Sequence, residues 1–267
     1  MKKLLCIDSD GCAIDSMNTK HRLCFGPALY EVWTFSLPDE EVQRRWEKIN
    51  LFSAQRGINR FAGAAAILQQ VESSVPPQQV EEFVRWTACA EELSNGAVEK
   101  CVRDGAPPVF RQALEWSRRV NEKISALPMA HPFANVADCL AGAADAADVV
   151  VVSSANREAI LQEWKAGGLD GYVRRYYSQN DGSKAQCIAC AKAEGYAAGD
   201  ILMIGDAPGD WKAAQANGVW FYPILAGKEE QSWRELGRQA LPDFLQGNWT
   251  PRRQEELVAR MMANLGE

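Results

Sequence analysis

The sequence predicts an α/β protein, with a parallel, doubly wound sheet and a helical segment inserted after the first strand. From about residue 132 onward, short apolar runs alternate with helical patterns, and such alternation is typical of parallel strands joined by helices. Between about residues 16 and 130 several amphipathic helical patterns occur without a convincing strand. We therefore expect a core domain of residues 1–15 and 131–267, with a C-terminal helical extension, and an all-helical domain of residues 16–130.

The expected strands are short apolar runs that end at turn or polar residues. They are residues 3–7, 148–152, 172–177, 201–204 and 219–222. The expected helices of the core have apolar residues at helical spacing. They are residues 135–147, 156–165, 183–194 and 208–216, followed in the polar tail by about 229–239 and 252–265. In the inserted segment, helices are expected to start at Pro38, at the pair Pro76 and Pro77, and at the pair Pro107 and Pro108, because proline fits the first turn of a helix.

Composition and charge narrow the class of protein. Nearly half of the 267 residues, 47%, are apolar, so the chain can build a sizeable core. A formal net charge of −6 argues against a nucleic-acid or membrane-surface binder, which would carry a basic patch. The apolar run at residues 4–7 is too short for a signal peptide or a membrane span. We expect a cytoplasmic protein, either a monomer or a small homo-oligomer.

Polar residues follow the strands in a pattern that indicates phosphoryl transfer. The groups are Asp8, Asp10 and Gly11 after the first strand, Ser153 and Ser154 after the second, Lys184 at a helix start, and Asp206 and Asp210 after the fourth strand. The carboxyl ends of parallel strands meet at one edge of the sheet, where ligands bind. Each residue alone is more simply explained as a turn or helix-cap acid or a solvated charge. All of these residues together, in this order, indicate phosphoryl transfer much more specifically than any one of them alone.

The chemistry gives each group a role. One of two carboxylates placed two residues apart can attack phosphorus while the other exchanges a proton with the leaving oxygen. Carboxylates close together need a cation, and Asp206 can complete an oxygen site for Mg²⁺. A serine hydroxyl and the Lys184 ammonium can hold the phosphoryl oxygens. Gly11 allows a tight turn that aims backbone amides at the phosphate.

This ordered set closely resembles the four motifs of the haloacid dehalogenase superfamily, over about residues 1–16 and 130–222. The resemblance implies a flavodoxin-like sheet, a helical cap after the first motif and an aspartyl-phosphate intermediate. It implies that Asp8 is the nucleophile and a Mg²⁺ ligand, and that Asp10 is general acid and base and offers its backbone carbonyl to the metal. Ser153 and Lys184 would bind phosphate, while Asp206 and Asp210 would bind Mg²⁺. Ser154 is an alternative to Ser153, and Cys12 stands where members often have threonine.

The resemblance favours phosphate-ester hydrolysis of a small phosphorylated metabolite, because dehalogenases and phosphonatases lack the second aspartate. Two alternatives remain. Sugar-phosphate mutases of the superfamily have a histidine near the end of the first hinge. In this sequence Lys20 stands at that position, and His21 lies one residue beyond it. A catalytically silent binding protein could keep the same fold.

One stretch of the inserted segment, residues 50–61, combines a glycine with two arginines. In capped members of the superfamily such a loop often contacts the leaving group of the substrate. Arg56 and Arg60 could bind a second anionic group of the substrate, since guanidinium groups bind carboxylates and phosphates through two hydrogen bonds. The alternative is that both arginines are solvated or pair with acids of the same segment, such as Glu47.

Overall fold

The computed structural model of the chain describes residues 2–266. Within it the chain forms two units, each packed mainly within itself. One contains the residues up to Met17 and those from Met129 onward, and the other contains Asn18–Pro128. The boundaries expected from the sequence, after residues 15 and 130, lie two residues from these divisions. Each unit contains its own buried apolar residues.

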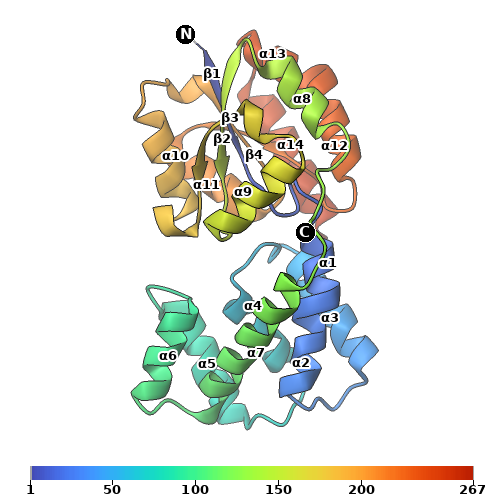
Figure 1. The fold of residues 1–267 in the computed structure, drawn as a ribbon, viewed down its shortest axis with the longest axis vertical. Helices are drawn as coiled ribbons and strands as arrows, with labels where there is room; N and C mark the ends of the chain where they lie inside the picture. Colours follow the sequence, from blue (N-terminus) through green and yellow to red (C-terminus); the bar gives the residue numbers. More distant parts are fainter. Residues whose placement is uncertain (1, 267) are drawn as a thin grey trace. The chain divides into compact units, whose positions relative to one another are not determined.

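The first unit is built on a parallel sheet of five strands, shown in Figure 1. They are β1 (Lys3–Ile7), β2 (Ala147–Val152), β3 (Val173–Tyr177), β4 (Ile201–Gly205) and β5 (Trp220–Pro223). All neighbours pair in parallel, in the order β3-β2-β1-β4-β5. The predicted doubly wound class is confirmed. The strand order is that of Rossmann-type sheets, whereas the resemblance implied the flavodoxin-like variety of the same class.

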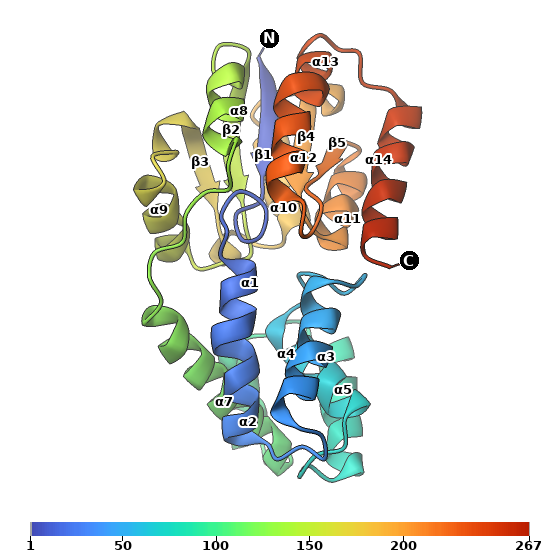
Figure 2. The ribbon, with the colours of Figure 1, turned by 90° about the vertical axis from the view of Figure 1, so that its right-hand side faces the viewer.

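Alternate residues of β1 face two separate apolar layers, as the pleat of a strand requires. Leu5 and Ile7 join the cluster that includes residues of α8 (Val136–Ala143), α9 (Arg157–Ala166) and α12 (Glu229–Glu235). Leu4 and Cys6 join the cluster on the opposite face. That face is covered by α10 (Lys184–Lys192), α11 (Pro208–Asn217) and α14 (Pro251–Asn264). Figure 2 looks onto the face that α8 and α12 cover.

The C-terminal extension is helical, as the sequence predicts. α12 continues through a π-helical turn, Leu236–Ala240, into α13 (Leu241–Leu245), and α14 follows. The helix expected over residues 135–147 is shorter. It ends at Ala143, and Ala147 already belongs to β2. The residues between them form a turn, and only Ala147 at the end of the expected range is a strand residue, which periodicity alone does not distinguish over a few positions.

The second unit consists of helices inserted in the chain between β1 and β2. They are α1 (Met17–Lys20), a π-helical turn (His21–Phe25), α2 (Gly26–Val32), α3 (Asp39–Leu51), α4 (Arg60–Gln70), α5 (Pro77–Cys89), α6 (Asn95–Arg103) and α7 (Pro108–Ser125). The predicted proline starts are confirmed, with Pro38 before α3 and Pro77 and Pro108 in the first turns of α5 and α7. Trp33, Trp46 and Trp116 are among the fully buried residues of its core.

No helix within residues 2–266 is long and apolar enough to cross a membrane. The longest, α7, has 18 residues, and its buried and exposed positions alternate in the pattern of an amphipathic helix.

Candidate active site

Asp8 follows the central strand of the sheet and lies where the chain changes its direction of winding. From β1 the chain adds β2 and β3 on one side and then crosses to β4 on the other. Open α/β sheets bind ligands at this switch point, because the adjoining loops diverge there. The amide of Asp8 donates to the carbonyl of Ile204 on β4 at 2.9 Å. This bond fixes the end of β1 against β4, and the side chain of Asp8 is only 7% exposed.

Asp206 and Asp210 come from the turn between β4 and α11. Asp206 follows Gly205 directly, and Asp210 lies in the first turn of the helix. One carboxylate oxygen of Asp210 accepts the amide of Ala207 at 3.0 Å and so caps the helix. A side chain at Gly205 would collide with this carboxylate, because an added Cβ would lie 2.4 Å from Cγ of Asp210. The glycine therefore leaves the space that Asp210 fills.

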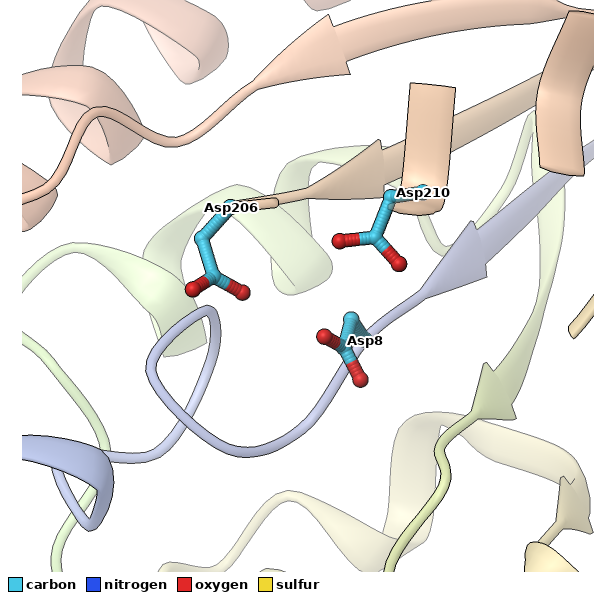
Figure 3. Close-up of side chains that lie close together, drawn as sticks. All are labelled: Asp8, Asp206 and Asp210. Carbon is cyan, nitrogen blue, oxygen red and sulfur yellow. The ribbon is translucent and has the colours of Figure 1, made fainter. Parts of the chain in front are cut away.

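The carboxylates of Asp8, Asp206 and Asp210 form one buried group, drawn in Figure 3. One oxygen from each lies within 4.8 Å of the others. Three carboxylates carry more negative charge than the single ammonium of Lys184 balances, and buried charge is costly without a counter-charge. Oxygen donors of this kind are those that a hard divalent cation such as Mg²⁺ prefers. The donor set fits the predicted metal site.

Lys184 opens α10 and reaches into the same group. Its Nζ lies 2.7 Å from Oδ2 of Asp8 and 2.5 Å from Oδ1 of Asp210. Burial by itself lowers the pKa of this ammonium, but the carboxylates of Asp210 and Asp8 outweigh burial, and the net effect raises its pKa. Lys184 is therefore a permanent cation beside the predicted nucleophile.

Asp8 is held between opposing influences on its charge. Burial raises the pKa of the Asp8 carboxyl well above its ordinary value, and the charges of Asp210 and Asp206 raise it further. The ammonium of Lys184 acts in the opposite direction and lowers it. The ionised form that a nucleophile needs therefore depends on positive charge next to Asp8.

Asp10 lies on the loop that leaves β1. Its carboxylate is half-buried and accepts a short hydrogen bond from the hydroxyl of Ser16. Within residues 2–266, the compact carboxylate group contains Asp8, Asp206 and Asp210, and the side chain of Asp10 is outside it. This placement is compatible with separate roles for the two carboxylates, one beside a metal and one available for proton transfer.

Gly11 shapes the same loop. Its φ of 75° lies in the left-handed region, which glycine enters without strain. Its amide donates to the carbonyl of Ile14 at 2.9 Å and so closes the turn. The predicted contact between Gly11 and phosphate stays a prediction.

The two candidate serines differ in their surroundings. Ser153 is 4% exposed, its amide donates to Tyr177 at 3.0 Å, and its hydroxyl accepts the amide of Ala155 at 3.1 Å. Ser153 is thus fixed directly after β2, the strand next to β1, whereas Ser154 is exposed. The contact of either serine with phosphate stays a prediction.

Comparisons with known proteins show which fold family the structure resembles. No family profile and no curated protein sequence matches the chain. A haloacid dehalogenase-like hydrolase from Streptococcus pneumoniae matches in structure with a TM-score of 0.52 and 16% identity, over 89% of this chain and 91% of that one. CbbY from Rhodobacter sphaeroides, solved with phosphate, matches with a TM-score of 0.53 and 12% identity, over 90% and 98%.

A candidate phosphoglycolate phosphatase from Lactobacillus delbrueckii subsp. bulgaricus also matches, with a TM-score of 0.53 and 14% identity, over 89% of this chain and 92% of its own. This chain has the fold of the haloacid dehalogenase-like hydrolases. The resemblance inferred from the motifs is thereby confirmed for the fold. At these sequence identities, the structural similarity does not indicate which substrate this chain binds.

In this haloacid dehalogenase-like fold, the helical unit contains the residues predicted to bind the substrate. Arg56 is buried, and its guanidinium donates to the carbonyl of Leu51 at 2.9 Å. Arg60 opens α4 and donates to the hydroxyl of Ser117 at 3.1 Å and the side chain of Asn121 at 2.7 Å. Both arginines thus have partners inside the helical unit, and their contact with a substrate stays a prediction.

His21, the residue behind the mutase alternative, lies in the π-helical turn of the helical unit. Its ring stacks on Phe25 at 4.6 Å and on Trp46 at 5.6 Å between centroids. These contacts make it part of the aromatic packing of that unit.

The sequence did not reveal two features of the site. The hydroxyl of Ser16 donates to the carboxylate of Asp10. The short separation of six residues was the only sign of this contact in the sequence. Gly205 makes room for Asp210, and the sequence of the motif gives no reason for a glycine there. Both depend on how the loops fold back, which short-range patterns do not describe.

Proposed function

We propose that this protein hydrolyses a phosphate monoester of a small metabolite in a Mg²⁺-dependent reaction, with a covalent phosphoryl intermediate on Asp8. One observation carries the proposal: the buried carboxylates of Asp8, Asp206 and Asp210 converge with the ammonium of Lys184 at the switch point of the sheet. A nucleophile, a cation site and a fixed positive charge then lie within a few ångströms.

In the first step, a carboxylate oxygen of Asp8 attacks phosphorus and the bond from phosphorus to the leaving oxygen breaks. Asp10, protonated at this stage, gives its proton to the departing alkoxide. In the second step, the ionised Asp10 takes a proton from water, which attacks the aspartyl-phosphate and releases inorganic phosphate. Asp8 is then regenerated as a carboxylate.

Two residues are suited to hold the phosphoryl group during both steps. The hydroxyl of Ser153 and the ammonium of Lys184 can bind its oxygens, as the motifs predict. In the present structure Lys184 binds Asp8 and Asp210. Binding of a phosphoryl group would give this ammonium a further anion to neutralise, in addition to the two carboxylates.

Asp8, Asp206 and Asp210 would hold the Mg²⁺ ion through their carboxylates, and Asp10 through its backbone carbonyl. When bound, Mg²⁺ supplies the positive charge that offsets the negative charge of the phosphoryl oxygens. We place the reaction in the cytoplasm, with a small phosphorylated metabolite as partner and no nucleic acid or membrane. The net charge of −6 supports this choice.

The experiment that tests the function uses the purified full-length chain and a generic aryl phosphate. We expect phosphate release with Mg²⁺, no release with excess chelator, and recovery when Mg²⁺ is restored. Rapid acid quenching followed by mass spectrometry of peptides should place a phosphoryl group on the peptide that contains Asp8.

Three outcomes would contradict the proposal in different ways. Full activity of the metal-stripped protein would exclude the metal requirement. Conversion of a sugar phosphate to its isomer, at a rate above that of phosphate release, would favour the mutase alternative. Binding of metabolites without turnover of any phosphate ester would indicate the silent binding protein.

A further inference from the structure

Two buried tryptophans hold the loop between β1 and α1. Trp164 on α9 donates its indole N–H to the hydroxyl of Ser9 at 2.9 Å. Trp233 on α12 donates its indole N–H to the carbonyl of Cys12 at 2.7 Å. Both tryptophans are 0% exposed, and so are Ser9 and Cys12. The loop is therefore attached on two sides by side chains that the proposed mechanism does not otherwise use.

The attachment points lie on either side of Asp10. Ser9 and Cys12 precede and follow the pair formed by Asp10 and Gly11. Within the loop, the carbonyl of Ser9 accepts the amides of Ala13 at 3.0 Å and Ile14 at 2.9 Å. These bonds make the loop a compact turn, with Asp10 between the two residues that the indoles bind.

The surroundings of the two indoles make their bonds effective restraints. Trp164 and Trp233 belong to one apolar cluster, which also contains Cys12, Ala13 and Ile14. A carbonyl in such a place has no water to replace a lost donor, so it would move to find another. Any such movement of Cys12 would carry Asp10 with it.

From these contacts we infer that Trp233 and Trp164 are positioning residues that hold Asp10 at the distance its proton transfers require. The inference rests on the proposed function. It also gives the C-terminal extension a role, since α12 lies beyond the last strand of the sheet and nevertheless restrains the loop that follows the first one. Catalysis is sensitive to such placement, because misplacing a catalytic group by about 1 Å can cost on the order of 100-fold in rate.

The test replaces the donor and follows the proton transfer. Trp233→Phe and Trp164→Phe each remove the N–H and keep an aromatic ring. We expect each to lower kcat for an alkyl phosphate about tenfold more than for an aryl phosphate, with KM changed little. Alkoxide leaving groups need the proton of Asp10, whereas aryl leaving groups need it less. A loss of folded protein alone would lower both rates equally and leave their ratio unchanged.

Trp249→Phe is the matched control. Trp249 is buried in the same cluster and donates its indole N–H to Gln254 at 3.3 Å, away from the loop. This variant should keep the wild-type ratio of alkyl to aryl rates. If Trp233→Phe does not fold, the analogue β-(3-benzothienyl)alanine at position 233 removes the N–H and keeps the size of the indole.

The possible results separate this inference from the proposed function. A wild-type protein without phosphatase activity contradicts the proposed function itself. An active wild type, with alkyl-to-aryl ratios unchanged in the Trp233 and Trp164 variants, contradicts the positioning role alone. A shifted ratio in both variants, with Trp249→Phe unchanged, supports it.

Discussion

The Nζ atom of Lys184 lies 2.7 Å from Oδ2 of Asp8, so the predicted phosphate-binding cation directly neutralises the predicted nucleophile. The same ammonium lies 2.5 Å from Asp210. One side chain thus offsets part of the charge of a group of three carboxylates. This relationship links the stability of the site to its reactivity.

Replacing Lys184 by methionine should lower kcat on every phosphate ester, because a charge that binds the phosphoryl group is lost. Removing one partner of a buried ion pair costs ~3–5 kcal/mol. The metal-free variant should therefore melt on the order of 10 °C lower. Mg²⁺ should stabilise it more than it stabilises the wild type, since the carboxylates have lost their cation. Melting curves with and without Mg²⁺ measure this, with Lys192→Met on the same helix as the control, and equal Mg²⁺ effects would refute the argument.

Asp8→Asn should abolish turnover and leave the fold intact. In metal-free protein the raised pKa of Asp8 also predicts a pH effect. A carboxyl whose pKa is higher in the folded state contributes stability at low pH and loses it as the pH rises through the folded pKa. Asparagine does not titrate, so the melting temperature of Asp8→Asn relative to wild type should increase as the pH rises above about 4. A difference that is constant with pH would show that the Asp8 pKa is not raised.

Asp206→Asn should weaken Mg²⁺ binding, because it removes one charged oxygen ligand from the group. We expect the Mg²⁺ concentration for half-maximal activity to rise at least about tenfold. Asp200→Asn is the control. Asp200 precedes the same strand and forms an ion pair with Lys3 at 2.5 Å, away from the site. Equal Mg²⁺ requirements in the two variants would remove Asp206 from the metal site.

Asp10→Asn should slow alkyl phosphates more than aryl phosphates. General acid–base catalysis contributes ~10²–10⁴-fold, and aryl leaving groups need less protonation. Comparing kcat for one alkyl and one aryl ester measures the effect, with the exposed Asp15→Asn as the control. Equal losses on the two esters would assign Asp10 a structural role.

Arg56→Ala and Arg60→Ala should raise KM or lower kcat for a metabolite with a second anionic group, and leave a small aryl phosphate nearly unaffected. Arg60 also binds Ser117 and Asn121, and Arg56 is buried and binds the carbonyl of Leu51. Both variants therefore need a melting curve to exclude a loss of folded protein. Arg44→Ala, with a side chain 76% exposed, is the control. If both variants match wild type on every substrate, these arginines do not determine specificity.

The sequence predicted the strand ends and the residues that follow them, because apolar runs and polar breaks are local signals. Asp8 and Asp206 were found in this way, and the structure places them directly after the ends of two adjacent strands. The roles of Trp233 and Gly205 could not be predicted. The indole of Trp233 reaches a carbonyl 221 positions earlier in the chain, and Gly205 is needed because of a helix that folds back over it. Contacts of this range depend on packing, which periodicity does not encode.

The position of β1 in the sequence affects how the nascent chain folds during synthesis. β1 is made first, yet its neighbours β2 and β4 begin only at Ala147 and Ile201. At about 5–20 residues per second, the apolar segment of β1 stays without a partner strand for on the order of 10 s. Exposed apolar strands are aggregation-prone, and flanking charges such as Lys2 and Lys3 counteract this. The helical unit, whose core needs no strand of the sheet, can fold during this interval, so that its own apolar residues are buried while β1 still lacks a partner strand.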